Sequence, residues 1–470
     1  MPQDQYLLSK KATVINLIKY LTEKHDWEVS VLAVNASGKR YSISKAGTNI
    51  SDDSLLCSRG FVITVFDGNV TAEYSCSQID DVNFSKIEQE LSKMCPMDNC
   101  LGNYAEKIPP AEYFAEYQIH PEEMGDEKII SHLDKVRTKT LSIDSRITDC
   151  NIFCSYACTG KMFIKGNRQG ICQEKIQNIL WMTSAVRVLA ARGDEIKDYY
   201  KGYSNLGGAE VLSQMEKDAE NNAKTVLELL ESEQITPGEY ECICAPDVTG
   251  MIVHEAFGHG VEMDMFVKNR ALAKEYIGKY VASPLVTMHD GATAAKQTAT
   301  YFFDDEGTDA NDTVVIDKGI LKQGISDLQS ARKLGTMPTG NGRRESYKRK
   351  AYTRMTNTFF EAGTDKPEDM IASIKYGFLL ENASSGMEDP KNWGIQCMVN
   401  IAREIKDGKL TGKIFSPIVL TGYVPDLLKS ITMVSDKVEL SGGGYCGKGY
   451  KEWVKVSDGG PYIKAIIRLG

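Results

Sequence analysis

A polar break near the middle of the chain limits what it can fold into more than any other feature. Residues 231–239 are polar and contain Pro237-Gly238, a combination that ends regular structure. Before the break, apolar residues recur at helical spacing over 207–230, and after it the chain is rich in glycine and in short strand-like runs. We therefore expect an α+β protein with an N-terminal α/β domain over 1–232 and a β-rich C-terminal domain over 233–470.

The first domain combines helix-like and strand-like patterns. Apolar periodicity predicts helices over 7–21, 84–94 and 126–141. We expect a further split into two subdomains near 100–145. Strand-like patterns lie at 28–35 and 40–44, which we interpret as one pair of strands. We interpret the patterns at 61–66 and 70–76 as a hairpin around 67–69. A further strand-like pattern covers 149–172.

Composition excludes several classes of protein. With 42% hydrophobic and 25% charged residues, the chain has the composition of an ordinary globular protein. It has no run of about 18 apolar residues, so no membrane helix is expected. Residues 1–26 contain several lysines and do not resemble a secretion signal. The net charge of −9 does not indicate nucleic-acid binding, and we expect a cytoplasmic protein.

Twelve cysteines without a secretion signal indicate cytosolic thiols rather than disulfides. Cys150, Cys154 and Cys158 are evenly spaced, which invites a metal-cluster interpretation. Four residues along a strand span about 13 Å, however, which is too far for one ion, and the flanking residues favour a strand. We therefore interpret these three, like Cys242 and Cys244, as buried thiols on one face of a strand.

The segment that carries recognisable chemistry is His254-Glu255-Ala256-Phe257-Gly258-His259. It is one residue longer than the H-E-x-x-H zinc motif, whose histidines share one face of an α-helix. On an ideal helix, residues i and i+5 lie roughly 140° apart, so two such imidazoles cannot easily share one ion. A π-bulge aligns i with i+5, and Gly258 and Gly260 permit such a distortion. The sequence therefore predicts a metal site that requires a locally widened helix.

A catalytic zinc keeps three protein ligands and one open position. His254 and His259 would supply two ligands, and Glu255 would take the proton of a zinc-activated water as the general base. The alternative is that the histidines merely end a helix, with Glu255 in a salt bridge or a cap. Spacing alone leaves the third ligand open between Glu262, Asp264, His289 and a distant cysteine.

The motif and its context resemble the TldD/PmbA family of metalloproteases. The resemblance is strong over about 235–450 and weaker before residue 230, where Ser58-Arg59-Gly60-Phe61 is similar to a turn of the family. It favours the metal-bearing TldD branch over the PmbA branch, whose members lack the metal ligands. The matching stretches, in order, are HEAFGHGVEMD at 254–264, DDEGT at 304–308, DKGIL at 317–321, PTGNGRRESY at 338–347, RMTNT at 354–358 and GYCGK at 444–448.

The resemblance implies a β-rich C-terminal lobe that bears one zinc per chain, with Cys446 as the third ligand beside His254 and His259. The same ligands could take another divalent ion. The resemblance also implies a peptidase for unfolded peptides and maturation precursors, which bind as an added strand in an enclosed cavity. It further implies a dimer, either with a PmbA (TldE)-type subunit or with a second copy of the chain.

A basic cluster within the matched region suggests substrate binding. Arg343, Arg344 and Arg354, with Asn357 in the same motif, are candidates to hold the carbonyl or carboxylate groups of a peptide, and the alternative is a solvated face. Two other functions stay open. One is a non-catalytic subunit or scaffold with a structural metal or none, whose fourth ligand would be a nearby carboxylate. The other is a zinc hydrolase that acts on something other than peptides.

Overall fold

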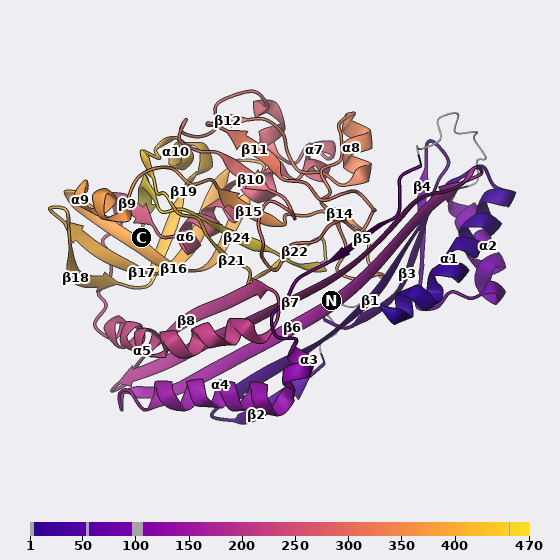
Figure 1. Ribbon diagram of the computed structural model, residues 1–470. Coiled ribbons are helices and arrows are strands. Elements are labelled where there is room, and N and C mark those ends of the chain that lie inside the picture. The colour runs from indigo at the N-terminus through magenta and orange to yellow at the C-terminus, as the bar shows by residue number, and fades with distance from the viewer. Residues whose placement is uncertain (1–3, 53–55, 96–106, 451) are drawn as a thin grey trace.

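The N-terminal half of the chain forms one long curved sheet (Figure 1). The structure, a computed structural model, describes residues 4–52, 56–95, 107–450 and 452–470. The strands of this sheet are β1 (Glu28–Ser44), β2 (Gly47–Ser51), β3 (Ser58–Phe66), β4 (Thr71–Cys76), β5 (Ala111–Phe114), β6 (Ile147–Asn167), β7 (Gly170–Arg192) and β8 (Glu195–Leu206). They run in the order β4-β3-β1-β6-β7-β5, with β2 paired to β1 and β8 to β7. Among the described pairings of this sheet, only that of β5 with β7 is parallel.

The segments 28–35 and 40–44 were predicted as a pair of strands, and this prediction is wrong, because they form the single strand β1. Gly38 makes no turn. A side chain at this position would overlap the carbonyl oxygen of Tyr156, so the glycine instead allows β6 to lie close to β1. The end of β1 pairs with β2, from Arg40 opposite Ser51 onward. The predicted hairpin at 61–66 and 70–76 is confirmed by the pairing of β3 with β4.

The sheet is continuous across the predicted split near 100–145, because β1 pairs with β3 on one side and with β6 on the other. Residues 100–106 of that stretch lie outside the described residues. Within the described sheets, no strand up to Leu206 pairs with a strand after Gly238. The predicted domain boundary at 232 lies between these two sets of strands.

Helices cover one face of this sheet at its two ends (Figure 1). They are α1 (Gln5–Lys24), α2 (Phe84–Met94), α3 (Pro121–Met124), α4 (Asp126–Leu141) and α5 (Leu212–Leu229). Val29 and Val31 of β1 pack in the core under α1 and α2, and Tyr41 and Ile43 pack in the core under α4 and α5. These four residues share one face because side chains alternate along a strand. The helices predicted over 84–94 and 126–141 are confirmed as α2 and α4.

The cysteine row on β6 points into the same core. Cys150 and Cys154 are buried under α4 and α5, and Cys158 packs against that core. The prediction that they share one face of a strand is confirmed.

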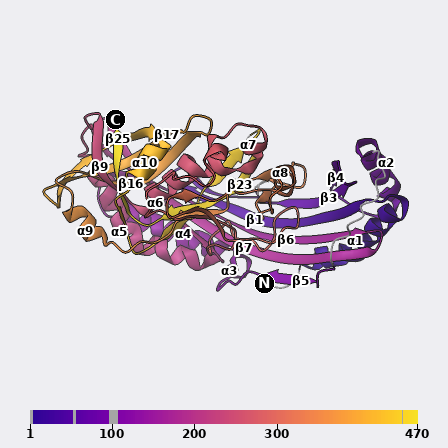
Figure 2. The ribbon, with the colours of Figure 1, turned by 90° about the horizontal axis from the view of Figure 1, so that it is seen from above.

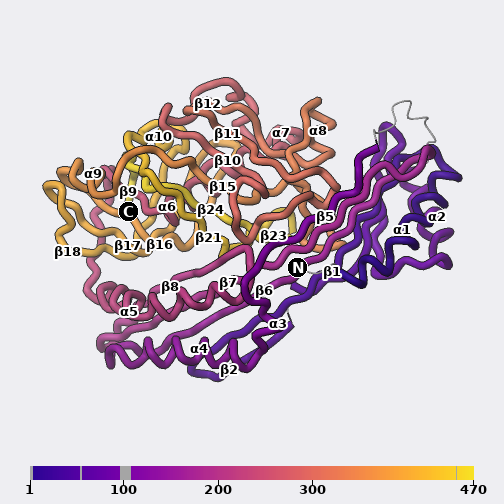
Figure 3. Tube along the Cα trace, viewed as in Figure 1, coloured from indigo at the N-terminus to yellow at the C-terminus, as the bar shows by residue number. Residues whose placement is uncertain are grey.

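The chain leaves the sheet after α5 and enters a β-rich C-terminal lobe (Figure 3). One sheet of this lobe contains β9 (Gly238–Cys244), β16 (Tyr376–Asp389), β17 (Gly394–Lys406), β18 (Lys409–Phe415), β19 (Ile418–Tyr423), β20 (Met433–Val434) and β25 (Ile463–Leu469). A second sheet contains β10 (Met288–Asp290), β11 (Thr313–Asp317), β12 (Ile320–Leu321), β15 (Asn357–Phe360), β21 (Glu439–Ser441) and β24 (Ser457–Gly460). The mixture of helices and sheets confirms the α+β class.

Two short hairpins and five short helices complete the lobe. The hairpins are β13 (Gly342–Arg343) with β14 (Tyr352–Thr353) and β22 (Tyr445–Lys448) with β23 (Glu452–Lys455). The helices are α6 (Pro246–Met251), α7 (Met263–Val267), α8 (Leu328–Leu334), α9 (Pro367–Ala372) and α10 (Val424–Lys429). Helix α6 contacts both β16 and β24, so it lies between the two sheets.

The C-terminal lobe rests on the face of the N-terminal sheet opposite its helices and covers only part of its length (Figure 2). Leu32 and Val34 of β1 pack against Phe303 of the lobe. The Nζ atom of Lys161 on β6 lies 2.5 Å from an oxygen of Asp305, which belongs to the 304–308 motif. The lobes are therefore joined by both apolar packing and a buried ion pair. Among the described helices, none is long and apolar enough to cross a membrane.

Candidate metal centre

The predicted widened turn is present. Residues Ile252–Gly258 continue α6 as a π-helix, and the N–H of His259 donates to the carbonyl oxygen of His254, five residues earlier. Both glycines have ordinary helical or nearby backbone angles, so neither is needed for a positive φ. A side chain on Gly258 would instead overlap the Sδ atom of Met355, and one on Gly260 would lie 2.7 Å from an oxygen of Glu388. The glycines therefore permit close packing around the turn.

The π-helical turn brings both histidines to one cysteine. The ligand atoms of His254, His259 and Cys446 all lie within 4.8 Å of one another. The Sγ atom of Cys446 is 3.3 Å from Nε2 of His259, and the two imidazole rings meet edge to face at 5.2 Å. Cys446 reaches this position on β22, which packs against the turn from the far end of the sequence. The three predicted ligands therefore form one cluster.

The cluster's electrostatics favour a bound thiolate. Burial raises the pKa of the Cys446 thiol, but hydrogen bonds to His254 and His259 outweigh it and lower the pKa to about 4. Burial lowers the pKa of His259, but the carboxylate of Glu262 and the sulfur of Cys446 together raise it well above its usual value. Without a metal, a proton held on the histidines thus balances the negative sulfur.

These donors fit a zinc ion. Thiolate sulfur and imidazole nitrogen are the atoms that structural and catalytic zinc sites use. Of the described residues, only this trio brings three potential ligand atoms into such a cluster. Cys446 belongs to the apolar core of the lobe and His254 is buried, whereas His259 is partly exposed.

A carboxylate orients the second histidine from behind. Oε2 of Glu262 lies 3.1 Å from Nδ1 of His259, the ring atom opposite the one that faces Cys446. Lys448 donates to the same carboxylate at 3.0 Å, and Arg354 lies 3.9 Å from its other oxygen. Burial raises the pKa of Glu262, but Lys448 and His259 lower it to about 2. Such a carboxylate–histidine pair fixes the tautomer of a metal-binding imidazole.

The other candidates for third ligand lie elsewhere. Glu262 contacts Nδ1 of His259, on the side of the ring that points away from Cys446, so its carboxylate does not join the ligand cluster. Asp264 is paired with Lys448 at 2.6 Å. His289 pairs with Asp312 at 2.7 Å and stacks on Phe359. None of these three belongs to the described ligand cluster.

Glu255 sits between the first histidine and β16. A side chain added at Gly386 of β16 would lie only 2.5 Å from the Cγ atom of Glu255, so the two residues are in close contact. Cys397 lies next to Gly386 as well. Burial is the main cause that raises the pKa of Glu255 above its usual value, partly offset by the two histidines. A carboxylate with a raised pKa beside a metal is suited to accept and return a proton near neutral pH.

The basic cluster is not gathered at the ligands. Arg354 is fully buried and donates to the carbonyl oxygen of Cys446 at 2.5 Å, so it positions the strand that carries Cys446. Asn357 is also buried and donates to the carbonyl oxygens of Gly291, Ala292 and Ala295. Arg354 and Asn357 therefore hold backbone, and their role in substrate binding stays a prediction.

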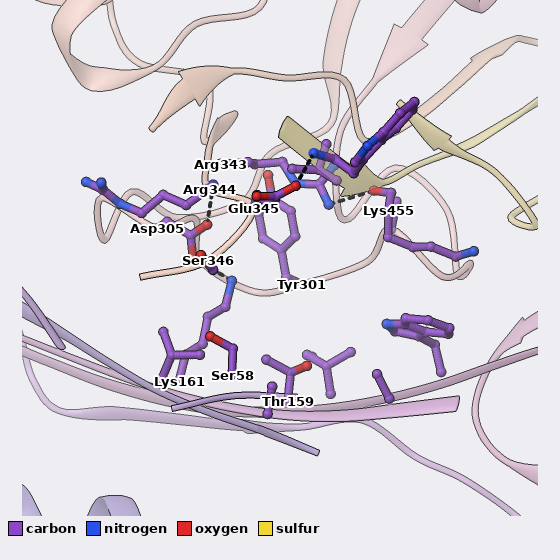
Figure 4. A pocket seen from close by; sticks show the side chains of 18 of the residues that line it. Ser58, Thr159, Lys161, Tyr301, Asp305, Arg343, Arg344, Glu345, Ser346 and Lys455 are labelled. Carbon is purple, nitrogen blue, oxygen red and sulfur yellow. Dashed lines mark hydrogen bonds and ion pairs between the residues drawn. The ribbon is translucent and has the colours of Figure 1, made fainter. Parts of the chain in front are cut away.

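Arg343 and Arg344 line a different pocket, between the lobes (Figure 4). The guanidinium of Arg343 donates to two backbone carbonyl oxygens, each at 2.6 Å, and Arg344 pairs with Glu73. The pocket faces Thr159 and Lys161 of the N-terminal sheet (Figure 4). It lies across the β22–β23 hairpin from the ligands, because Tyr445 and Cys446 point to opposite faces of β22. Substrate binding by these two arginines also stays a prediction.

A larger cleft opens beside the ligands. This cleft, which we call the interlobe cleft, has a volume of about 1450 Å³ and lies between β8 and α5 on one side and α6, β16 and β21 on the other. Asp458 lines it and places Oδ2 3.9 Å from Nδ1 of His254. That nitrogen is buried and has no hydrogen-bond partner among the described residues. The cleft thus comes within one side chain, that of Asp458, of the predicted ligand His254.

Two of these groups were missed by sequence reasoning. Lys448 follows Cys446 by two residues on a strand, so alternation could have placed it on the same face. Asp458 comes from another strand, and only the packing of β24 against α6 brings it to His254.

Residues 237–465 match the family model described as the PmbA/TldA metallopeptidase C-terminal domain. The metalloprotease TldD homologue of Buchnera aphidicola is 36% identical over 236 residues, which are 50% of this chain and 48% of that protein. The zinc metalloprotease TldD homologue of Saccharolobus solfataricus is 31% identical over 245 residues, which are 52% of this chain and 54% of that protein. The chain thus spans about half the length of these curated relatives.

Solved structures match nearly the whole chain. TldE from Thermococcus kodakarensis superposes with a TM-score of 0.74, covering 97% of this chain and 100% of that chain at 16% identity. A protein from Thermotoga maritima described as a modulator of DNA gyrase superposes with a TM-score of 0.77 over 98% of this chain and 100% of that one, at 17% identity. At such identities the likeness shows a shared fold.

Proposed function

Because the chain belongs to the TldD/PmbA family of metallopeptidases, we propose that it is itself a zinc peptidase that cleaves unfolded peptides or peptide precursors. The observation that carries the proposal is the convergence of His254, His259 and Cys446 within 4.8 Å, directly beside Glu255. A bound zinc would polarise the scissile carbonyl and lower the pKa of a water molecule in its open position.

Each side chain of the centre then has its own task. His254, His259 and Cys446 would hold the ion, and Glu262 would keep the ring of His259 turned toward it. Glu255 would take a proton from the attacking water and pass it to the leaving amine, which suits its raised pKa.

Strand addition is supported by an open edge next to Glu255. Strand β16 pairs with β17 along most of its length, but with β9 only over 377–380. The second edge of 383–389 pairs with no described strand, and Gly386 within it contacts the side chain of Glu255. An extended peptide on this edge would pass the general base, and recognition through main-chain hydrogen bonds would accept many sequences.

The scaffold alternative has less support. It requires a carboxylate to close the site, and the two candidates from the motif, Glu262 and Asp264, are engaged by His259 and Lys448 instead. The proposed partner is a TldE-like subunit, which rests on the family resemblance and on the shared fold with TldE.

The test is cleavage of an unfolded peptide by the zinc-loaded protein, alone and with a TldE-like subunit. Glu255→Gln should keep the zinc, measured by mass spectrometry, and lose cleavage. Glu361→Gln changes an exposed carboxylate outside the site and is the matched control. Cleavage retained by Glu255→Gln would reject the general-base role, and zinc-loaded protein that cleaves no peptide in either form would reject the peptidase.

A further inference from the structure

We propose that the interlobe cleft selects peptides that carry lysine or arginine side chains. The proposal rests on the peptidase function above and names the substrate class of the same site.

The cleft has an excess of unpaired negative charge. Its cations Arg187 and Arg403 are already paired inside the protein, to Asp198 at 2.8 Å and to Glu381 at 2.6 Å. This leaves Lys201 as its one cation without an ion pair among the described residues.

The carboxylates of the cleft are less well matched. Glu210, Asp218, Asp247 and Glu439 all line it, and none of them forms an ion pair with any described residue. Glu210 and Asp247 accept hydrogen bonds from backbone N–H groups, which do not cancel a full charge. A positively charged ligand would therefore supply these carboxylates with the cationic partners that the protein itself does not provide.

Aromatic rings stand among these carboxylates. Burial, followed by the carboxylate of Asp247, raises the pKa of Tyr199 to about 12. The pKa of Tyr462 is raised mainly by burial and, to a smaller extent, by the negative charges of Glu381 and Glu439. The Tyr462 ring therefore lies close to these two carboxylates. Both rings line the cleft, as does the exposed ring of Tyr200. Tyrosine faces beside carboxylates suit an ammonium or guanidinium group, which gains both charge pairing and cation–π contact.

The acidic lining reaches the metal centre itself. The carboxylate of Asp458 lies 3.9 Å from Nδ1 of His254, a residue that is only 5% exposed. This nitrogen atom has no hydrogen-bond partner among the described residues. A peptide that lies in the cleft and reaches Asp458 would therefore bring its cationic side chains close to His254 of the proposed metal centre. An acidic peptide would face repulsion along the same path.

The test measures binding without cleavage. Three fluorescent peptides share one sequence except at three positions, which are all lysine, all glutamine or all glutamate. Binding to the zinc-loaded Glu255→Gln protein is followed by fluorescence anisotropy at about 0.05 M and about 0.5 M salt. We expect the lysine peptide to bind about tenfold more tightly than the glutamine peptide at low salt, with the glutamate peptide weakest and the differences reduced at high salt. Equal binding of the three peptides would overturn the proposal.

A charge reversal locates the effect. Glu439 is exposed on the edge strand β21, so Glu439→Lys should leave the fold intact. It should reduce the lysine preference by about threefold, as expected of one exposed charge pair. Glu361→Lys is the matched control outside the cleft, and an equal loss in both variants would reject the cleft as the cause.

Cleavage of the same peptides separates the two proposals. Charge-dependent binding without cleavage by the active protein would reject the peptidase function and leave the cleft inference standing. Cleavage of all three peptides with equal kcat/KM, together with equal binding, would leave the peptidase and overturn the inference.

Discussion

The Nε2 atom of His259 lies 3.3 Å from the Sγ atom of Cys446, although 187 residues separate them in the chain. A π-helical turn presents the histidine, and a hairpin from near the C-terminus presents the cysteine. The candidate metal centre therefore forms only in the folded lobe, and metal binding is expected to be coupled to its folding.

Loss of the thiolate should empty the centre. We expect Cys446→Ala to retain less than about a tenth of the zinc of the unchanged protein, since second-sphere changes alone cost 10–100-fold in affinity and loss of a ligand costs at least as much. Zinc content is measured by mass spectrometry after dialysis. Cys57→Ala removes an exposed thiol and is the matched control. Full zinc occupancy in Cys446→Ala would show that another residue is the third ligand.

Zinc binding should release protons at neutral pH. The pKa of His259 is raised well above its usual value, chiefly by Glu262 and Cys446 against the opposing effect of burial, so the metal-free site holds a proton that zinc must displace. Calorimetric titrations in buffers with different ionisation enthalpies count the protons released. Glu262→Gln removes the carboxylate that favours the protonated ring, so fewer protons should be released. Equal release from both proteins would contradict the assigned protonation.

Gly258→Ala should destabilise the protein by about 1–3 kcal/mol, because the added methyl group overlaps Met355 in a packed core. The free energy of unfolding is measured by urea denaturation of the metal-free protein. Gly422→Ala is the control, since nothing lies within 4 Å of a side chain at that strand position. Equal stability of the two variants would show that the turn can relax around the methyl group.

The ion pair between the lobes should give a pH-dependent stability. Lys161→Met leaves the buried carboxylate of Asp305 without its cation and should cost about 3 kcal/mol at pH 7. Burial raises the pKa of Asp305, but Lys161 together with Arg344 outweighs burial and lowers the pKa below the usual 3.8. The ion pair therefore contributes fully to the free energy of unfolding above pH 3.8, and this contribution is lost as the pH falls through the lowered pKa of Asp305 in the folded protein.

Urea denaturation of both proteins from about pH 3 to pH 7 tests this dependence. The difference in unfolding free energy should be largest near pH 7 and shrink as the pH falls, because protonation of Asp305 removes the charge that Lys161 balances. Lys322→Met breaks the exposed pair with Asp317 and should cost less than about 1 kcal/mol. A Lys161→Met effect no larger than this control would show that the pair does not hold the lobes together.

Short-range patterns were predictive where neighbours in the sequence are neighbours in space. The helices at 84–94 and 126–141 have the predicted bounds. The spacing of His254 and His259 demanded a widened turn, because an ordinary helix separates them by about 140°, and the turn is present. The prediction at 28–44 was wrong because the strand continues through Gly38, which serves the close approach of two strands.

The sequence by itself determined the local geometry: the periodicity of the helices, the alternation on β6, and the need for a π-turn between two histidines and beside Glu255. The tertiary structure alone decided which distant groups complete the centre and the cleft. It brought Cys446 to the histidines, Asp458 to His254, and the side chain of Arg354 to the backbone of the third ligand rather than to the cluster. Backbone geometry fixes positions a few residues apart, whereas contacts between distant segments arise from the packing of sheets, which no local spacing records.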